Sequence, residues 1–521
     1  MDLSFPLTPG DGRHLYQQIY EYIREEIRTG RLAAGEKLPA TRQLAANLQI
    51  ARTTAELAYA QLEEEGYLVI RRGSGAYVSE ISNIPEVIQE YGKEPAGVLG
   101  DERGESPASE VQENAPAADG FDGAGLIDFS PRTIDMSMFP YATWRRILRG
   151  TLTGDRSDLF RRGDPKGDLG LRTTIAHYLH LSRGCVCDPE QVIIGAGNDY
   201  LLMVLSILLR GDGAGGALRI AMERYTYLRA AQVLQAEGYE IAEVASDAGG
   251  IVVRGEGDSL EASGCRLVYT MPARQFPTGV VMPYPRRAEL LAWARAGEQR
   301  YIIEDDYDSE FKYRGRPVPS LQSTDQNGQV IYIGTFSKSI APAIRVSYLI
   351  LPKRLLPAFE RRAGFLSCTV PRLDQAILNE FIRDGYFERY LNRMRNRYKG
   401  KHDHMLELLS PFEKRFIIKG QGAGLHLVLE QEPEEGHTAA QWEQVLTAKA
   451  RERGILIYPM EEQRLEASGT ADQDPSKNKN QPARILLGYA ALAEDEMEKG
   501  MEGLAAAWKV CPCNLHGSEK R

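Results

Sequence analysis

The stretch that decides the fold is GTFSKSIAPAIR, residues 334–345, which directly follows the apolar run VIYI. The run predicts a strand, so Lys338 is expected just beyond a strand end in a sheet protein. Two hydroxyl side chains, Thr335 and Ser337, precede the lysine, and Arg345 follows seven residues later. An amine beside hydroxyls and a guanidinium suits a phosphate-bearing aldehyde that bonds the lysine as a Schiff base. A surface lysine near a turn is the plainer interpretation of an isolated Ser-Lys pair.

Composition places the chain among globular proteins of more than one domain. It has 521 residues, of which 43% are hydrophobic and 26% charged, a typical balance for a chain that buries a sizeable core. The opening residues, MDLSFPLTPGDGRHLY, have no basic segment followed by an apolar one, so no secretory signal is indicated. The apolar run at residues 200–209 is about half of the ~20 residues that span a bilayer. We expect a cytoplasmic protein without a membrane partner.

Cysteine content and charge argue against a disulfide-stabilised protein, a metal site and DNA binding through overall charge. Six cysteines are too few and too scattered for a disulfide framework in a chain of this length. Cys511, Cys513 and His516 offer metal-ligand chemistry, but no second ligand cluster is visible, so we expect no metal site. The net charge is −9, and residues 1–80 hold nine Lys and Arg against eleven Asp and Glu. Any DNA binding must therefore come from a local group of arginines rather than from bulk charge.

The chain divides into three regions and a tail. Residues 1–80 show a compact pattern of three helices and a hairpin, and residues 81–125 are rich in Gly, Pro, Ala, Glu and Ser. The second composition buries too little apolar surface to fold, which favours a flexible linker over a poorly patterned part of the next domain. Residues 126–510 form the large second domain, and residues 511–521 form the tail. The low-complexity stretch EASGTADQDPSKNKNQP, at residues 466–482, predicts a mobile surface insertion.

Short apolar runs alternate with helical patterns throughout the second domain. This alternation predicts an α/β fold with a mostly parallel central sheet and helices on both faces. Strands are expected at residues 192–194, 219–221, 266–270, 301–304 and 330–333, and helices at residues 227–237 and 285–296.

The amino-terminal region has the pattern of a winged helix-turn-helix. Apolar residues recur at helical spacing over residues 15–27, and Thr41 is expected to cap a helix that ends at residue 48. A further helix is expected to begin at residue 51 or 52 and to end at residue 65. Two short apolar strands around RRGSG then form a hairpin. This order of elements is the layout of a DNA-binding winged helix.

The same region resembles the GntR family of winged-helix regulators, because LPATRQLA, ARTTAELAY and GSGAYV match that family's pattern in order. The resemblance implies a double-stranded DNA operator as a partner. It places residues of two helices and of the wing at the DNA, namely Arg42, Arg52, Thr53, Thr54, Gly73 and Gly75. Arg52 and Thr53 open the recognition helix, where side chains reach base edges or phosphates. Each residue taken alone is equally well interpreted as solvated surface.

A second chemical segment, YIIEDDYDSEF, spans residues 301–311. Carboxylates directly after a buried strand are costly without a cationic partner. Alone, the segment is equally typical of a metal site or of a solvated strand end. Beside Lys338 it supplies what pyridoxal 5'-phosphate (PLP) requires: a carboxylate that keeps the pyridine nitrogen protonated and a phenol for the ring hydroxyl.

These segments resemble fold-type I aminotransferases, and the resemblance assigns roles to the matched residues. Asp305 is the partner of the pyridine nitrogen and Tyr307 of the ring hydroxyl, while Lys338 forms the Schiff base. The phosphate partners are Arg345, Thr335 and Ser337. A planar guanidinium suits a phosphate better than a lysine would.

Further segments extend the resemblance over most of residues 126–489. The turn in IIGAGNDYL precedes a helix, so its main-chain amides are expected to cup the phosphate. These amides are those of Ala196, Gly197 and Asn198. ERYTY makes Tyr227 the residue stacked on the ring and Arg229 a candidate effector contact. Arg484, just before ILLGY, is a second effector candidate, with an exposed arginine as the plainer interpretation.

A GntR-type winged helix, a linker and an aminotransferase-like domain, in this order, resemble the MocR/GabR family of transcriptional regulators. The resemblance implies a head-to-tail, domain-swapped homodimer with cofactor sites between subunits. It also implies that an amino-compound effector forms an external aldimine by displacing Lys338, which changes operator occupancy. The alternatives are an active PLP-dependent aminotransferase with an accessory winged helix, and a regulator that no longer binds PLP.

Four positions depart from the family's pattern. Arg162 stands where a tyrosine from the partner subunit reaches the phosphate, and Tyr225 replaces the proline before the stacking tyrosine. Arg274 replaces a histidine before Gln-Phe-Pro, and Ser347 replaces a glycine after Arg345. None removes the Schiff-base lysine or the electron sink. Together they predict a ligand pocket richer in arginine, suited to an acidic or phosphorylated effector, and they argue against efficient turnover.

Overall fold

The three-dimensional structure is a computed structural model, and it describes the chain in separate stretches. These are residues 15–28, 31–33, 35–48, 50–64, 67–71, 74–78, 126–153, 156–210, 218–313, 319–465 and 481–510. The predicted linker at residues 81–125, the predicted tail at residues 511–521 and Gly73 lie outside the described residues, as does most of the predicted insertion.

The described residues between 15 and 78 form the expected winged helix. Its elements are α1 (Leu15–Arg28), α2 (Thr41–Leu48), α3 (Arg52–Glu64), β1 (Leu68–Arg71) and β2 (Gly75–Val78). The apolar stripe of α1 explains why this helix forms, since Ile19, Ile23 and Ile27 are buried in one cluster with residues of α2 and α3. β1 and β2 pair antiparallel. Thr41 is the first residue of α2 rather than a residue preceding it, which corrects its expected role as the cap.

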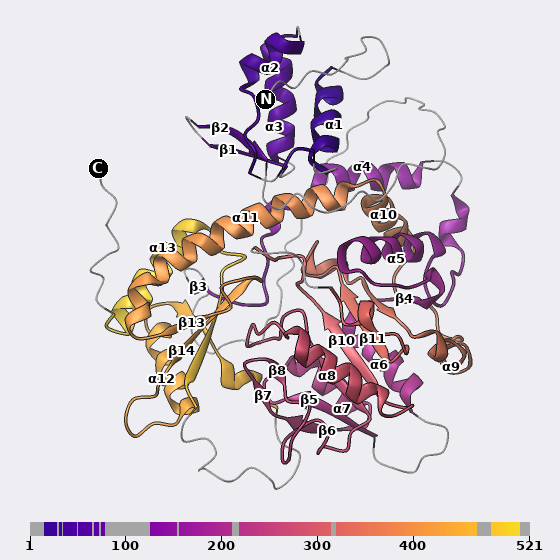
Figure 1. The fold of residues 1–521 in the computed structure, drawn as a ribbon, viewed down its shortest axis with the longest axis vertical. Helices are drawn as coiled ribbons and strands as arrows, with labels where there is room; N and C mark the ends of the chain where they lie inside the picture. The colour runs from indigo at the N-terminus through magenta and orange to yellow at the C-terminus, as the bar shows by residue number, and fades with distance from the viewer. Residues whose placement is uncertain are drawn as a thin grey trace, which may run out of the picture.

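A seven-stranded sheet forms the centre of the second domain (Figure 1). Its order is β4-β12-β11-β10-β9-β5-β6; β12 is antiparallel to both its neighbours, and the other pairs are parallel. The strands are β4 (Val192–Gly195), β5 (Leu218–Glu223), β6 (Tyr239–Val244), β9 (Leu267–Thr270), β10 (Tyr301–Asp306), β11 (Val330–Thr335) and β12 (Ser347–Ile350). The mostly parallel α/β sheet is confirmed, whereas β6 and β12 were not among the predicted strands.

Helices cover both faces of this sheet, because alternate strand residues point to opposite sides. In β11, Tyr332 lies in one buried cluster with residues of α5, α10 and α11, whereas Ile331 and Ile333 lie in another with residues of α6, α7 and α9. We call this sheet and its helices the large lobe. The helices are α4 (Tyr141–Leu152), α5 (Leu169–Arg183), α6 (Asn198–Leu209), α7 (Leu228–Ala236), α8 (Tyr284–Arg295), α9 (Leu356–Arg362), α10 (Arg372–Arg383) and α11 (Tyr386–Leu409).

A four-stranded antiparallel sheet, in the order β13-β14-β17-β16, forms a small lobe with α12 and α13. Its elements are β13 (Ile417–Lys419), β14 (His426–Gln431), α12 (Ala439–Arg451), β16 (Tyr458–Pro459), β17 (Ala483–Gly488) and α13 (Glu494–Ala507). β3 (Ile127–Asp128) pairs with β15 (Ile455–Leu456) beside this sheet. The long helix α11 connects the lobes (Figure 1), with Tyr390 in the large-lobe core and Met405 in the small-lobe core.

Among the described residues, no helix is long and apolar enough to cross a membrane.

Candidate functional site

A cavity of about 260 Å³ lies where β10 and β11 end, at the carboxyl edge of the large sheet. Open α/β sheets bind ligands at this edge. The predicted residues that line it are Asn198, Tyr227, Arg229, Asp305, Tyr307, Thr335, Ser337, Lys338 and Arg345. Residues to which the sequence assigned no role also line it, namely Pro131, Arg132, Asp199, Met271, Phe276 and Pro342.

β10 ends in three consecutive acids, and each has different surroundings. Glu304 is buried and accepts two main-chain N–H groups of the loop at residues 321–322, at 2.7 and 2.9 Å. Asp306 is buried against Arg183, with 2.7 Å between carboxylate and guanidinium. Asp305 is out of phase with both along the strand and lines the cavity instead. Glu304 and Asp306 therefore have structural roles, and Asp305, between them, faces the site.

Asp305 has one oxygen satisfied and one without a partner. Its Oδ2 accepts hydrogen bonds from Asn198 Nδ2 at 3.2 Å and from the Tyr269 hydroxyl. Its Oδ1 is buried with no hydrogen-bond partner among the described residues. Burial, the largest cause, raises the pKa of Asp305 to about 7. A protonated ring nitrogen at Oδ1 would supply both the missing donor and the missing positive charge, so the residues present fit PLP.

The Lys338 amine lies in the same cavity, held by main-chain oxygens. Its Nζ donates to the carbonyl of Arg132 at 2.7 Å and to that of Pro131 at 3.2 Å. Burial lowers its pKa to about 8; Asp308 opposes this shift, and the Arg132 and Arg274 charges add to it. A lysine with this pKa is partly neutral near physiological pH, and the neutral amine is the form that attacks an aldehyde.

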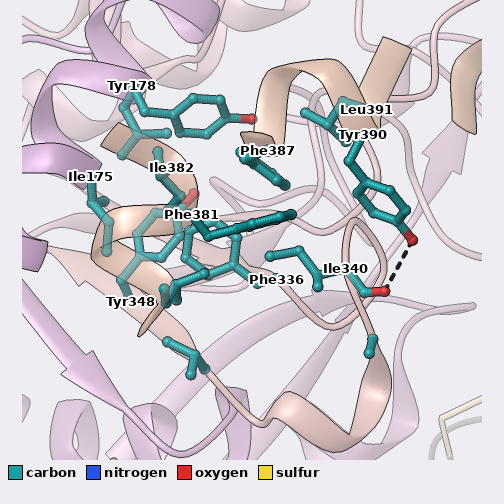
Figure 2. Packing of buried hydrophobic residues seen from close by; sticks show 14 of the residues in the cluster. Ile175, Tyr178, Phe336, Ile340, Tyr348, Phe381, Ile382, Phe387, Tyr390 and Leu391 are labelled. Atoms are coloured by element: carbon teal, nitrogen blue, oxygen red, sulfur yellow. Dashed lines mark hydrogen bonds between the residues drawn. The ribbon is translucent and has the colours of Figure 1, made fainter. Parts of the chain in front are cut away.

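A tight turn positions Lys338, and the aromatic core of the large lobe fixes that turn (Figure 2). The Ile340 N–H donates to the Phe336 carbonyl at 2.8 Å, which closes the turn around the lysine. The Phe336 ring packs edge-on against Phe387 at 5.6 Å, and the Tyr390 hydroxyl donates to the Ile340 carbonyl at 3.3 Å. The buried neighbours of the lysine are thus anchored while its amine faces the cavity.

Arg345 and the glycine turn before α6 are fitted to each other. Arg345 has φ 50°, an uncommon left-handed conformation for a residue with a side chain, and its guanidinium lies 3.3 Å from Asp199. Gly197, at φ 92°, leaves room for it, since a Cβ there would come within 2.1 Å of the guanidinium. Asp199 also faces Arg229 at 3.9 Å. Asp199 is a site residue that the sequence reasoning missed, although it stands beside Asn198 in the quoted turn.

Two of the three predicted phosphate amides are already bonded within the protein. The Ala196 N–H donates to Thr369 Oγ1 at 2.9 Å, and the Gly197 N–H donates to the Gly195 carbonyl at 2.9 Å. Neither residue lines the cavity. Asn198 does line it, as the first residue of α6, but its side chain is directed to Asp305. The expected cup of three amides is therefore corrected to the start of α6 alone.

Arg484 is the predicted effector contact that the structure places away from the cavity. It lies on β17 of the small lobe, bonds Glu430 at 3.1 Å and stacks on Tyr225 at 5.7 Å. It does not line the cavity. The cross-strand position of Glu430, directly opposite Arg484 in the β14–β17 pairing, explains why the guanidinium turns to this carboxylate.

The departures from the family's pattern also have structural partners. Arg274 is buried, bonds Asp308 at 2.9 Å and donates to the His426 carbonyl at 2.8 Å, so it does not line the cavity. Arg162 is exposed and donates to the Phe365 carbonyl at 3.4 Å. The expectation that Arg274 enriches the pocket is wrong for this chain, and Arg132 lines the cavity instead. Arg162, which was expected to act at the partner subunit's site, does not line the cavity of its own subunit.

Two further departures act as supports. Ser347 is fully buried and donates from Oγ to Thr335 Oγ1 at 2.9 Å, which orients a predicted phosphate partner. The Tyr225 hydroxyl donates to Glu461 at 3.0 Å, which links the residues before Tyr227 to the small lobe. Neither contact obstructs the cavity.

Aromatic side chains form the apolar part of the cavity wall. Phe276 packs edge-on against Tyr227 and Tyr307, with ring centroids 6.4 and 6.1 Å apart. Burial raises the pKa of both phenols, which keeps them as neutral hydrogen-bonding groups. Phe276 belongs to the Gln-Phe-Pro tripeptide that follows Arg274, and no role was assigned to it from the sequence because a phenylalanine carries no chemical signal of its own.

In the winged helix, the predicted DNA residues occupy the starts of α2 and α3. Arg42 and Thr53 are exposed and Thr54 is half-buried. Arg52 is exposed and bonds Glu56 one turn later at 2.7 Å. Gly75 has φ 114°, which favours glycine in the hairpin. Lys37 and Arg71, 5.7 and 4.9 Å from the Tyr77 ring, add cations at the wing.

No group of three or more His, Cys, Asp or Glu side chains suited to a metal ion occurs within the part of the chain that the structure describes.

Comparison with protein families identifies both domains. Residues 15–78 match the family described as "Bacterial regulatory proteins, gntR family", and residues 137–502 match "Aminotransferase class I and II". The second match alone covers more than half of the chain.

Several curated relatives match over nearly the full chain. The chain is 36% identical over 497 residues to the uncharacterized HTH-type transcriptional regulator YdeL of Bacillus subtilis, covering 95% of this chain and 97% of that protein. It is 31% identical to the probable rhizopine catabolism regulatory protein MocR of Rhizobium meliloti, covering 95% and 94%. It is 30% identical to the pyridoxine biosynthesis regulator PdxR of Corynebacterium glutamicum, covering 82% and 86%.

Solved structures support the fold of the second domain. An archaeal alanine:glyoxylate aminotransferase matches with a TM-score of 0.62 at 24% identity, covering 74% of this chain and 91% of that one. Kynurenine aminotransferase of Pyrococcus horikoshii matches with a TM-score of 0.61 at 23% identity, covering 74% and 91%. At this identity the likeness shows a shared fold.

Proposed function

Because this chain belongs to the MocR/GabR family, GntR-type regulators that carry an aminotransferase-like domain, we propose that it is a PLP-dependent transcriptional regulator that senses an amino compound at Lys338. The observation that carries the proposal is the buried, unpartnered Oδ1 of Asp305 in the same cavity as a lysine of lowered pKa. An unpaired buried carboxylate oxygen is costly, and its persistence favours a ligand that supplies a donor.

The residues proposed to bind PLP contact different parts of the cofactor. Asp305 faces the ring nitrogen and Tyr307 the ring hydroxyl. Tyr227 and Phe276 supply the apolar wall, and Arg345 with Thr335 and Ser337 holds the phosphate. When bound, the cofactor supplies an aldehyde carbon that bonds an amine reversibly, first that of Lys338 and then that of the effector. The arginine's contact with Asp199 has to yield to the phosphate.

The proposed regulator has two macromolecular partners, DNA and a second copy of this chain. The winged helix binds a double-stranded DNA operator, with Arg42, Arg52, Thr53 and Thr54 at the duplex and the wing beside it. The protein acts as a head-to-tail homodimer, which brings two winged helices to paired half-sites. Release of the Lys338 amine is the local event, and it alters operator binding only if the effector binds one conformation better than another.

Two measurements on the full chain test the proposal. PLP added to the purified protein should give an absorbance band in the visible range that Lys338→Ala abolishes. Labelled DNA from upstream of its own gene should be shifted on a gel, and responsive amines should change that shift. A colourless protein that cannot be reconstituted with PLP contradicts the cofactor assignment.

The same measurements decide between regulator and enzyme. An active aminotransferase would convert a keto acid through many turnovers and would give no specific gel shift. A regulator gives the shift and at most one round of amino transfer per cofactor.

A further inference from the structure

The cavity wall contains one segment that is tied to the small lobe. Pro131 and Arg132 follow β3, whose pairing with β15 holds it beside the small sheet. Phe129, two residues earlier, packs in the small-lobe core, and its carbonyl accepts the Gly488 N–H at 2.8 Å. The other lining residues lie between residues 198 and 345, in the large lobe. The site is therefore formed by the large lobe and by a short strip that is anchored to the small lobe.

This strip lies directly against the reactive amine. The carbonyl oxygens of Pro131 and Arg132 accept from Lys338 Nζ at 3.2 and 2.7 Å. The Arg132 guanidinium is near enough to help lower the pKa of Lys338. An effector whose nitrogen replaces that of Lys338 thus has its adjoining substituents beside Arg132.

Arg132 is also the arginine of the cavity whose guanidinium has no hydrogen bond or ion pair among the described residues. Arg229 and Arg345 both face Asp199, at 3.9 and 3.3 Å. The Arg132 side chain is exposed and makes no hydrogen bond or ion pair within the described residues. Its charge acts on the pKa of Glu462, but no ion pair within 4.0 Å joins the two. A guanidinium in this setting is suited to an acidic group of a ligand.

Resting on the PLP-dependent sensing proposed above, we propose that Arg132 binds an acidic group adjoining the effector's amine and so links cavity occupancy to the small lobe. The effector class is then an amino acid in the broad sense, with a carboxylate or sulfonate, rather than a simple amine. Arg132 is a specificity residue, and the strip from Phe129 to Arg132 is the path by which the small lobe responds.

The test uses the full chain loaded with PLP and matched pairs of probes, one acidic and one lacking the acid: L-alanine with ethylamine, and β-alanine with propylamine. The half-saturating concentration is read from the visible spectrum. Hydrogen exchange of the amides at residues 127–135 is followed in the same samples. The variants are Arg132→Ala, Arg132→Lys and, as a matched control, Arg295→Ala, an exposed arginine on α8 outside the cavity lining.

In the wild type, at least one acidic probe should saturate the protein at a lower concentration than its neutral partner does. That probe should also slow hydrogen exchange of the amides at residues 127–135. Arg132→Ala should raise its half-saturating concentration about 10- to 100-fold, the range for a hydrogen bond to a charged group. It should also abolish the change in exchange. Arg132→Lys should retain part of both effects, and Arg295→Ala all of them.

The failures are distinguishable. A wild type that takes up no PLP contradicts the proposed function. A protein that takes up PLP but responds equally to both members of every pair, or to none of the acidic probes, overturns the role of Arg132 alone. Retention of the preference in Arg132→Ala overturns it as well.

Discussion

A Cβ built on Gly197 would lie 2.1 Å from a terminal guanidinium nitrogen of Arg345. The turn before α6 and the proposed phosphate arginine thus occupy adjoining space. We expect Gly197→Ala to displace the guanidinium and to weaken PLP binding about 10-fold or more, since a charged hydrogen bond contributes about 1.5–3 kcal/mol. Absorbance titration of the cofactor-free protein with PLP measures the effect.

Gly400→Ala is the matched control for this substitution. Gly400 lies within α11, and a Cβ there meets nothing within 4 Å. The same chemical change should leave PLP affinity unaltered and should stabilise the protein by up to about 1 kcal/mol, because alanine favours a helix. Unchanged affinity in Gly197→Ala would contradict the fit between the turn and Arg345.

The sequence predicted those parts of the site whose functional residues lie in short, recognisable motifs. Asp305, Tyr307 and Lys338 stand at strand ends in segments with a recognisable order, and the fold brings them to one cavity. Arg132 could not be found in this way, because it reaches the site through the pairing of β3 with a strand more than 300 residues later. A short Pro-Arg-Thr segment gives no local signal of that pairing.

The wrong prediction for Arg274 also arises from contacts between residues far apart in the sequence. Arg274 was expected to line a ligand pocket, but its charge is taken by Asp308 and by the main chain at His426. The fold itself was more predictable, since strand periodicity depends on neighbouring residues. β12 was missed because it is a short strand, Ser347–Ile350, that begins only two residues after Arg345, the proposed phosphate arginine.

The pKa of Lys338 predicts a pH dependence of the cofactor-free protein. Its amine titrates near 8 in the folded protein, against 10.5 in an ordinary lysine. The unfolded chain therefore binds more protons between these values, so the free energy of unfolding should rise with pH across that window. Lys338→Met should remove the rise. Urea denaturation at pH 7.5 and pH 10 measures it, and an identical pH response of both proteins would contradict the shift.

The raised pKa of Asp305 predicts that the free energy of unfolding changes with pH in the opposite direction at lower pH. Burial raises its pKa from 3.8 to about 7, so the folded protein binds more protons than the unfolded chain between these values. Stability from this group falls as the pH rises toward 7. At pH 8, cofactor-free Asp305→Asn should melt about 2 °C above the wild type, since 1 kcal/mol corresponds to roughly 2–4 °C in domains of about 150–250 residues and to less in a larger domain. The advantage should shrink at pH 5, and the same variant should bind PLP more weakly.

The buried Arg274–Asp308 pair predicts a large effect of breaking one side. Both side chains are 3% exposed, at 2.9 Å. Asp308→Ala should destabilise the protein by about 3–5 kcal/mol, because it leaves a buried guanidinium uncompensated. Adding Arg274→Met should recover much of the loss. Urea denaturation of the two single variants and the double variant measures the coupling, and simple additivity would contradict it.

The ion pair at the start of the recognition helix predicts that DNA binding can be strengthened. Arg52 bonds Glu56 at 2.7 Å, and both side chains are exposed, at 66% and 42%. This carboxylate competes with DNA phosphate for the guanidinium, so Glu56→Gln should tighten operator binding severalfold. It should also steepen the dependence of affinity on salt by about one unit, as one more phosphate contact forms. Glu36→Gln makes the same change of net charge on a residue that accepts the Ala33 N–H, so it should alter binding less. Gel-shift titrations at several salt concentrations compare them, and equal effects of the two variants would show that bulk charge, rather than release of Arg52, is responsible.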